Sequence, residues 1–264
     1  MLPGRAMLAG GFVCAVVAAA FVLAWMAFSG GESVARAAII DQLSAKQPDP
    51  DFVQAATATL EEAGYTVDYY PSEQVTVDFY RNLPTHDYDI VLLRAHSAVP
   101  RTDLALPADV PQETLQRIMD RIGDDVLLFT AQPYDNTAYL PEQKELRLFP
   151  VIFNGETTGD SYFAIASDFV ASSMNGRFKG TTVVLMGCSS LATDRTAAAL
   201  VDRGAKVVFG WSGLVSPEHT DAATERLLQY LITDKLSPSE AVEKTATELG
   251  PDPAFDSTLA MYPR

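Results

Sequence analysis

Two apolar runs of β character constrain the fold of this chain more than any other feature. One lies within Asp89–Ser97 and the other within Thr182–Ser190. Continuous apolar runs of this length are typical of strands that are buried on both faces of a parallel sheet. The first run leads to His96 and the second to Cys188, which is the only cysteine beyond residue 14. In a parallel sheet both side chains would emerge at the carboxyl edge, where α/β folds place their chemistry.

Strand and helix patterns alternate along most of the chain, which favours an α/β fold. Gly64 separates a helical pattern from the alternating run Tyr65–Tyr70, and this passage is typical of a βαβ crossover. The predicted strands cover residues 35–41, 65–70, 89–96, 162–166, 181–186 and 206–210. The predicted helices cover residues 51–63, 77–83, 167–174, 192–203, 219–233 and 237–249, and Ser237 with Glu240 forms a capping box for the last one. The alternation predicts a mainly parallel sheet with helices on both faces.

Residues 98–160 interrupt this alternation. The prolines that punctuate the segment are Pro100, Pro107, Pro111, Pro133, Pro141 and Pro150. Helical spacing recurs near 111–122, and residues 126–130 have strand character. We interpret the segment as an insertion over the carboxyl edge, in the form of a hairpin or flap near the site.

The first 31 residues form a separate hydrophobic segment. No charged residue occurs from Ala6 to Gly31, and Phe12–Phe28 is almost continuously apolar. With a helical rise of about 1.5 Å per residue, that stretch is roughly 26 Å long, close to the ~30 Å of a bilayer core. We therefore expect one N-terminal hydrophobic helix, with residues 7–28 in the membrane, followed by a folded domain over residues 32–264.

Two interpretations of the hydrophobic segment remain open. Its length and Trp25 near its end favour an uncleaved single-pass anchor, whereas the small residues of Val34–Ala38 favour a cleaved signal peptide. Arg5 is the only charge before the span, which favours an N-terminus in the cytoplasm. In both interpretations the domain lies outside the cytoplasm, either anchored in a membrane or secreted.

The domain is strongly acidic. All 34 Asp and Glu residues and 18 of the 19 Lys and Arg residues lie beyond residue 31, which gives that region a formal charge of −16. Such a surface argues against nucleic acid or an anionic membrane face as a partner. Because Cys188 is the only cysteine of the domain, no disulfide can form within it.

A cysteine nucleophile needs a base beside it, and histidine is the usual one. Of the three histidines, only His96 ends an apolar strand, whereas His86 lies in a polar turn and His219 opens a predicted helix. Gly187, directly before Cys188, lets the backbone turn sharply and lets a substrate carbonyl approach amide N–H groups. A Cys188–His96 dyad is the main hypothesis. The alternatives are a core histidine and an inert, small cysteine side chain.

Other common chemistries lack their sequence motifs. One cysteine and three scattered histidines provide no metal-ligand spacing, and no G-x-S-x-G elbow follows any strand. The glycine patterns of phosphate loops and dinucleotide-binding turns are also missing from the sequence. We therefore expect neither a metal nor a cofactor.

The two strand ends and the segment after Cys188 resemble the caspase–gingipain–clostripain superfamily of cysteine peptidases. A histidine ends one strand, a small residue and a cysteine end a later one, and residues 197–211 are similar to the helix–Gly-Ala–strand passage of gingipain-like domains. The resemblance covers about residues 36–100 and 160–249 and is densest over 178–215. It implies a caspase-like three-layer sandwich fold, and it implies that a histidine and cysteine pair cleaves peptide bonds.

Carried over to this chain, the resemblance makes Cys188 the nucleophile and His96 the proton carrier. The backbone amides of Ser97 and Cys188 would form the oxyanion hole. Three features depart from the family. Ser97 stands where the family usually has glycine, the caspase pentapeptide is missing, and the separation of 92 residues between His96 and Cys188 exceeds the ~50 of caspases. The insertion can account for the longer separation.

Trp211 and Ser212 follow the strand after the cysteine and are candidates for a substrate pocket, with a packed core tryptophan as the alternative. The sequence thus predicts a thiol-dependent endopeptidase that acts on polypeptide substrates and is membrane-anchored or secreted. The main alternative is a catalytically inactive caspase-like domain that binds a partner protein at the cell envelope. Redox sensing through Cys188 is disfavoured, because the domain has no second cysteine to resolve an intermediate.

Overall fold

The computed structural model describes residues 34–100, 112–152 and 161–264 of the chain. The predicted N-terminal hydrophobic helix, with its membrane span over residues 7–28, lies outside them. Within the described ranges, no helix has the length and apolar character that crossing a membrane requires. The chain divides into two units between Val34 and Ala35, and the fold described below is that of Ala35–Arg264.

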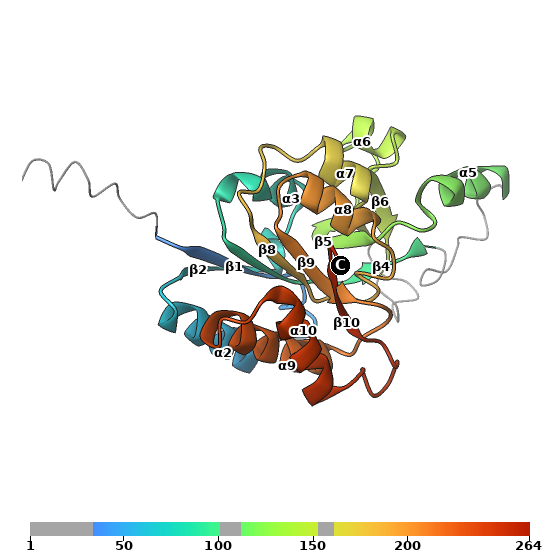
Figure 1. Ribbon diagram of the computed structural model, residues 1–264. Helices are drawn as coiled ribbons and strands as arrows, with labels where there is room; N and C mark the ends of the chain where they lie inside the picture. The colour runs from blue at the N-terminus through green and yellow to red at the C-terminus, as the bar shows by residue number, and fades with distance from the viewer. Residues whose placement is uncertain (1–33, 101–111, 153–160) are drawn as a thin grey trace, which may run out of the picture. The chain divides into compact units, whose positions relative to one another are not determined.

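A six-stranded, mostly parallel sheet forms the centre of this unit (Figure 1). Its strands are β1 (Arg36–Asp41), β2 (Thr66–Pro71), β3 (Ile90–Arg94), β8 (Thr182–Leu185), β9 (Val207–Trp211) and β10 (Leu259–Tyr262). Their spatial order is β10-β9-β8-β3-β1-β2. Among these described strands, only β10 runs antiparallel to its neighbour, β9. The prediction of an α/β fold with a mainly parallel sheet is confirmed, whereas β10 was not predicted.

Helices cover both faces of this main sheet (Figure 1). One face carries α2 (Pro50–Glu62), α9 (Pro217–Leu228) and α10 (Pro238–Leu249), and the other carries α3 (Val77–Asn82), α7 (Ser167–Ser172) and α8 (Arg195–Asp202). Successive residues of a strand point to opposite faces of the sheet. Ile39 and Leu92 pack toward the first group of helices, and Ile40 and Leu93 pack toward the second. Because both faces are buried, the strands appear in the sequence as continuous apolar runs.

The helix ends follow local sequence rules. The Asp49 side chain accepts a hydrogen bond from the Phe52 amide at 2.9 Å and caps α2. Ser237 and Glu240 form the predicted capping box at the start of α10. The helix predicted over 219–233 consists of α9 and a π-helical turn, η3 (Gln229–Thr233). Two short 3₁₀ turns, η1 (Ser72–Gln74) and η2 (Leu83–His86), flank α3.

A second, antiparallel sheet arises largely from the predicted insertion. Its strands are β4 (Ser97–Ala98), β5 (Leu127–Pro133), β6 (Leu148–Val151) and β7 (Tyr162–Ile165), in the spatial order β4-β5-β7-β6. The helices α5 (Gln112–Ile122) and α6 (Leu140–Lys144) lie between these strands in the sequence. The interpretation of residues 162–166 as a return to the parallel sheet was wrong. β7 pairs with β5 and β6 instead. Ala164 packs in the core of the second sheet, and Phe163 and Ile165 pack in the core next to the main sheet, so the apolar run alone does not distinguish the two sheets.

A buried carboxylate holds the second sheet against the helices of the main sheet. Asp125, just before β5, is 1% exposed. It accepts hydrogen bonds from the Val126 amide, from the hydroxyl of Thr196 on α8, and from the amide and hydroxyl of Ser167 on α7. Four donors to one carboxylate satisfy its oxygens without a cation, so the burial of this charge is compensated.

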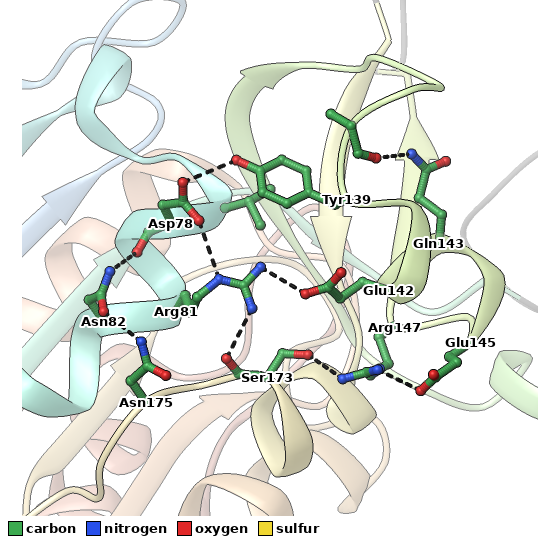
Figure 2. Close-up of polar contacts among 12 residues, drawn as sticks. Asp78, Arg81, Asn82, Tyr139, Glu142, Gln143, Glu145, Arg147, Ser173 and Asn175 are labelled. Atoms are coloured by element: carbon green, nitrogen blue, oxygen red, sulfur yellow. Dashed lines mark hydrogen bonds and ion pairs between the residues drawn. The ribbon is translucent and has the colours of Figure 1, made fainter.

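Arginines make a second connection between the same parts of the fold (Figure 2). Arg81 of α3 forms an ion pair with Glu142 of α6 at 2.9 Å and donates to the carbonyl of Ser173, after α7, at 3.2 Å. Arg147, just before β6, donates to the hydroxyl of Ser173 at 2.6 Å. The helices beside the main sheet and the second sheet therefore pack as one structure.

Candidate active site at the carboxyl edge of the main sheet

The ends of β3 and β8 place the two predicted catalytic residues at the same edge of the sheet. β3 and β8 are neighbouring parallel strands, and their last residue pair is Leu93 with Leu185. The Met186 amide continues the pairing by donating to the Leu93 carbonyl at 2.9 Å. His96 and Cys188 each lie three residues beyond the last pair. Both therefore leave adjacent strands in the same direction, at the carboxyl edge.

The two segments beyond the strand ends are in direct contact. The hydroxyl of Ser97 donates to the carbonyl oxygen of Cys188 at 2.6 Å. Gly187 fits so closely that a Cβ atom there would lie 2.3 Å from the Ala95 carbonyl oxygen and 2.3 Å from the Ser97 hydroxyl oxygen. Position 187 therefore requires glycine because of this close approach, and the approach keeps the histidine and cysteine segments side by side.

Cys188 is half-buried beside the loop that follows β9, and it forms no disulfide with any described residue. Its sulfur lies 3.5 Å from both the amide nitrogen and the carbonyl oxygen of Val215. The next residue, Ser189, has a φ of +53° and donates its amide to the Gly213 carbonyl at 2.7 Å. This left-handed residue turns the chain sharply after the cysteine and positions the thiol against residues 213–215.

The backbone and ring of His96 are both held by neighbours. Its amide donates to the side-chain oxygen of Gln42, after β1, at 3.0 Å, and its carbonyl accepts from the Phe129 amide of β5 at 3.0 Å. The imidazole ring lies 6.0 Å from the ring of Phe129, centroid to centroid. Burial, together with the positive charge of Arg94, lowers the pKa of His96 to about 4. The ring is therefore neutral near pH 7 and has a nitrogen that can accept a proton.

A buried charge cluster lies directly before His96 in the sequence. Arg94, at the end of β3, forms ion pairs with Asp41 at the end of β1 (3.0 Å) and with Asp221 of α9 (2.9 Å). It also donates to the carbonyl of Gln47 at 2.8 Å. Burial raises the pKa of Asp221 to about 6, although Arg94 opposes that shift. Burial raises the pKa of Asp41 as well.

This cluster was missed by the sequence analysis, although a signal for it exists. Arg94 is a charged residue inside an otherwise apolar strand, and Asp41 ends another such strand. A charge at that position needs a partner of opposite sign when it is buried. The sequence offers many acidic residues, however, and only the folded chain selects Asp41 and Asp221.

The predicted oxyanion-hole residues lie together. Ser97 is 6% exposed and is the first residue of β4. Its amide nitrogen would lie 2.9 Å from a Cβ at Gly187, so it is adjacent to the segment that carries Cys188. The Ser97 amide and the Cys188 backbone thus belong to the same contact between the two strand ends.

The two candidate pocket residues have different environments. Trp211 is 1% exposed, its indole nitrogen donates to the Thr220 hydroxyl at 2.8 Å, and its ring lies 5.2 Å from the ring of His219. Trp211 is therefore a packed core tryptophan, which was the alternative to its role in a substrate pocket. Ser212 is exposed, and its hydroxyl accepts from the Thr258 amide at 2.9 Å. In this loop, Val215 contacts Cys188 and Gly213 contacts Ser189, and the sequence analysis singled out neither of them.

In the described part of the chain, the remaining titratable groups form no second candidate catalytic or metal site. His86 stacks on Tyr88 at 5.8 Å, and its carbonyl accepts from Arg36 at the start of β1, at the opposite edge of the sheet from Cys188. Within the described ranges, no group of three His, Cys, Asp or Glu residues is placed to hold a metal ion. The thiol and the imidazole at the carboxyl edge are therefore the side chains with which the site could react.

A scan against models of protein families gives no match for this chain, and a search of curated proteins finds no relative.

Proposed function

We propose that this protein is a cysteine endopeptidase with a caspase-like three-layer fold, in which Cys188 attacks the substrate and His96 transfers the proton. One observation carries the proposal. A thiol and a neutral imidazole leave adjacent parallel strands at the carboxyl edge, and the Ser97–Cys188 hydrogen bond joins their segments. A cysteine needs such a base to become a nucleophile near neutral pH.

The proposed reaction proceeds through a thioester. His96 accepts the thiol proton as the sulfur of Cys188 attacks the carbonyl carbon of a peptide bond. The amides of Ser97 and Cys188 stabilise the resulting oxyanion. The carbon–nitrogen bond then breaks, and His96 donates its proton to the leaving amine. A water molecule, deprotonated by His96, attacks the thioester, and the products are a carboxylic acid and the regenerated thiol.

The proposed enzyme acts on polypeptides, and its domain lies outside the cytoplasm. A polypeptide is the proposed substrate, because the resemblance to the caspase–gingipain–clostripain superfamily implies cleavage of peptide bonds by the histidine and cysteine pair. The hydrophobic residues 7–28 would anchor the protein in a membrane with the domain outside the cytoplasm, and cleavage near 34–38 would instead release it. The negative charge of the domain favours neither nucleic acid nor an anionic membrane surface as a partner.

A peptidyl electrophile that reacts with catalytic thiols tests the proposal on the full chain. We expect labelling of the wild type, loss of labelling in Cys188→Ala, and at least a tenfold slower reaction in His96→Ala. His86→Gln serves as the matched control, because this histidine lies at the opposite edge of the sheet, and it should react like the wild type. Equal labelling rates in the wild type and His96→Ala would contradict the proposed role of His96.

A non-catalytic domain that binds a partner protein is the second candidate, and two contacts favour it. The hydroxyl of Ser97 occupies space beside Cys188 that a glycine would leave open, and the sulfur of Cys188 lies within hydrogen-bonding distance of the Val215 backbone. The first contact places a side chain beside the Cys188 backbone, and the second places the Val215 backbone against the sulfur. Under this alternative, a small alkylating agent would modify the wild type and His96→Ala equally, and no peptidyl probe would react.

A further inference from the structure

Three arginines converge on a hollow that is separate from the proposed active site. The hollow has a volume of about 420 Å³ and lies between α7, α8 and the segment before β8. Arg177, Arg195 and Arg203 line it together with the acids Asp168 and Asp202, and most of its other lining residues are alanines. The helices α7 and α8 that form its walls lie next to each other in Figure 1. Neither His96 nor Cys188 lines it.

The three guanidinium groups are not equivalent. Arg203 donates to four backbone carbonyls at and after the end of α7, so its role is structural. Toward the residues that the structure describes, Arg177 donates only to the carbonyl of Asp202, at 2.5 Å, and Arg195 only to the carbonyl of Arg121, at 3.0 Å. Among the described residues, neither Arg177 nor Arg195 forms an ion pair with a carboxylate. Their remaining N–H donors are therefore available to a ligand.

This arrangement is unusual for so acidic a chain. The sequence has 34 acidic and 19 basic residues and a formal charge of −15, yet these arginines gather in one place. Burial and, next to it, the positive charge of Arg177 lower the pKa of Arg203, as expected for two like charges that line one hollow. A bound anion would relieve this repulsion and accept the free donors.

We propose that the hollow binds a small hydroxylated phosphate ester, such as a polyol phosphate or sugar phosphate. The guanidinium groups of Arg177 and Arg195 would hold the phosphoryl oxygens, since planar N–H forks match phosphate geometry. Of the two acids that line the hollow, Asp168 is already paired with Arg121, and Asp202 is the one that would contact the ligand. Within the described residues its exposed carboxylate forms no ion pair, and it is available to accept a hydrogen bond from a ligand hydroxyl. The volume accommodates a ligand larger than phosphate alone.

Calorimetric titration of the full chain with inorganic phosphate and with glycerol 1-phosphate, at constant ionic strength, tests the site. We expect the ester to bind more tightly than inorganic phosphate. The double variant R177Q/R195Q should weaken both interactions at least tenfold. The matched control is Arg226→Gln, an exposed arginine that pairs with Glu248 on the opposite face of the main sheet, and it should bind like the wild type. Unchanged thermal unfolding of the variants would show that folding is intact.

Asp202→Ala separates the phosphoryl contact from the hydroxyl contact. Because this substitution removes a negative charge, inorganic phosphate should bind as well as before or more tightly, whereas the advantage of the ester should disappear. Equal binding by the wild type and R177Q/R195Q would overturn the proposal. A wild type that binds inorganic phosphate as tightly as the ester would overturn the assignment of Asp202. Neither result depends on whether Cys188 is catalytic.

Discussion

Arg94 is among the largest fully buried side chains of the described residues, and it is charged. Its two carboxylate partners come from the end of β1 and from α9, and its own strand continues to His96. Breaking a buried ion pair is strongly unfavourable, because the remaining charge has no partner. Arg94 therefore holds three segments of the carboxyl edge in one arrangement. The segment at the end of β1 continues to Gln42, and the side-chain oxygen of Gln42 accepts a hydrogen bond from the His96 amide. We regard Arg94 as a positioning residue.

Asp221→Asn should flatten the pH dependence of stability. The pKa of Asp221 is about 6 in the folded protein against an ordinary value of 3.8, so the folded state holds this proton more tightly than the unfolded chain does. Through this group, the free energy of unfolding rises as the pH falls from above 6 toward 4, by roughly 1–3 kcal/mol.

Urea unfolding at pH 7 and pH 4.5 would measure this effect. The wild type should gain more stability at the lower pH than Asp221→Asn does. Asp234→Asn removes an exposed acid just after η3 and is the matched control, which should follow the wild type. A gain of the same size in Asp221→Asn and the wild type would contradict the linkage.

At the scale of elements, the parallel pairing of β3 and β8 produces the candidate site. Parallel strands end at the same edge, so residues 92 positions apart in the sequence, His96 and Cys188, emerge side by side. The insertion does not separate them, because β4 follows β3 directly and the rest of the second sheet packs beside it. The close contact of Gly187 with Ala95 and Ser97 then completes the approach of the two ends.

Gly187→Ala should separate these two strand ends. Its Cβ would lie 2.3 Å from the Ala95 carbonyl oxygen, and a backbone atom cannot move aside cheaply. We expect a loss of about 1–3 kcal/mol in the free energy of unfolding, measured by urea titration, together with slower probe labelling. Gly213→Ala is the control within the adjacent loop, where the nearest atom would be Ser257 Cβ at an ordinary 3.4 Å. Equal stability of the two variants would count against the close approach.

At the scale of the molecule, Ala35–Arg264 contains every described strand and the cores on both faces of the main sheet. Within this unit, the buried Asp125 and the Arg81 network connect the second sheet to the helices of the main sheet. A chain of this size with one continuous set of cores typically unfolds as one cooperative unit.

A fragment of residues 35–264 should therefore fold and unfold in a single transition. Circular dichroism during urea titration would measure it. A fragment of residues 42–264 is the matched control. It lacks β1, the strand between β3 and β2, and should show no cooperative transition. A broad or absent transition in the 35–264 fragment would show that the first 34 residues contribute to folding.

Local patterns predicted most of the elements correctly, because burial leaves a periodic signal in the sequence. The helices near Phe52, Ala197 and Ala241 and the Ser237–Glu240 capping box follow from residue types a few positions apart. The common edge of His96 and Cys188 also followed from the two apolar runs. Where the prediction was wrong, at Tyr162–Ile165, the strand itself exists but pairs in the other sheet.

The sequence by itself determined most of the strands and helices, and which two of the strands end in a thiol and an imidazole. Only the tertiary structure decided which strands pair, that β10 closes the edge beside β9, and that Asp41 and Asp221 neutralise Arg94. The physical reason is that periodicity reports whether a residue is buried. The identity of its partner depends on long-range packing, in which many acidic or apolar residues along the chain could serve equally well.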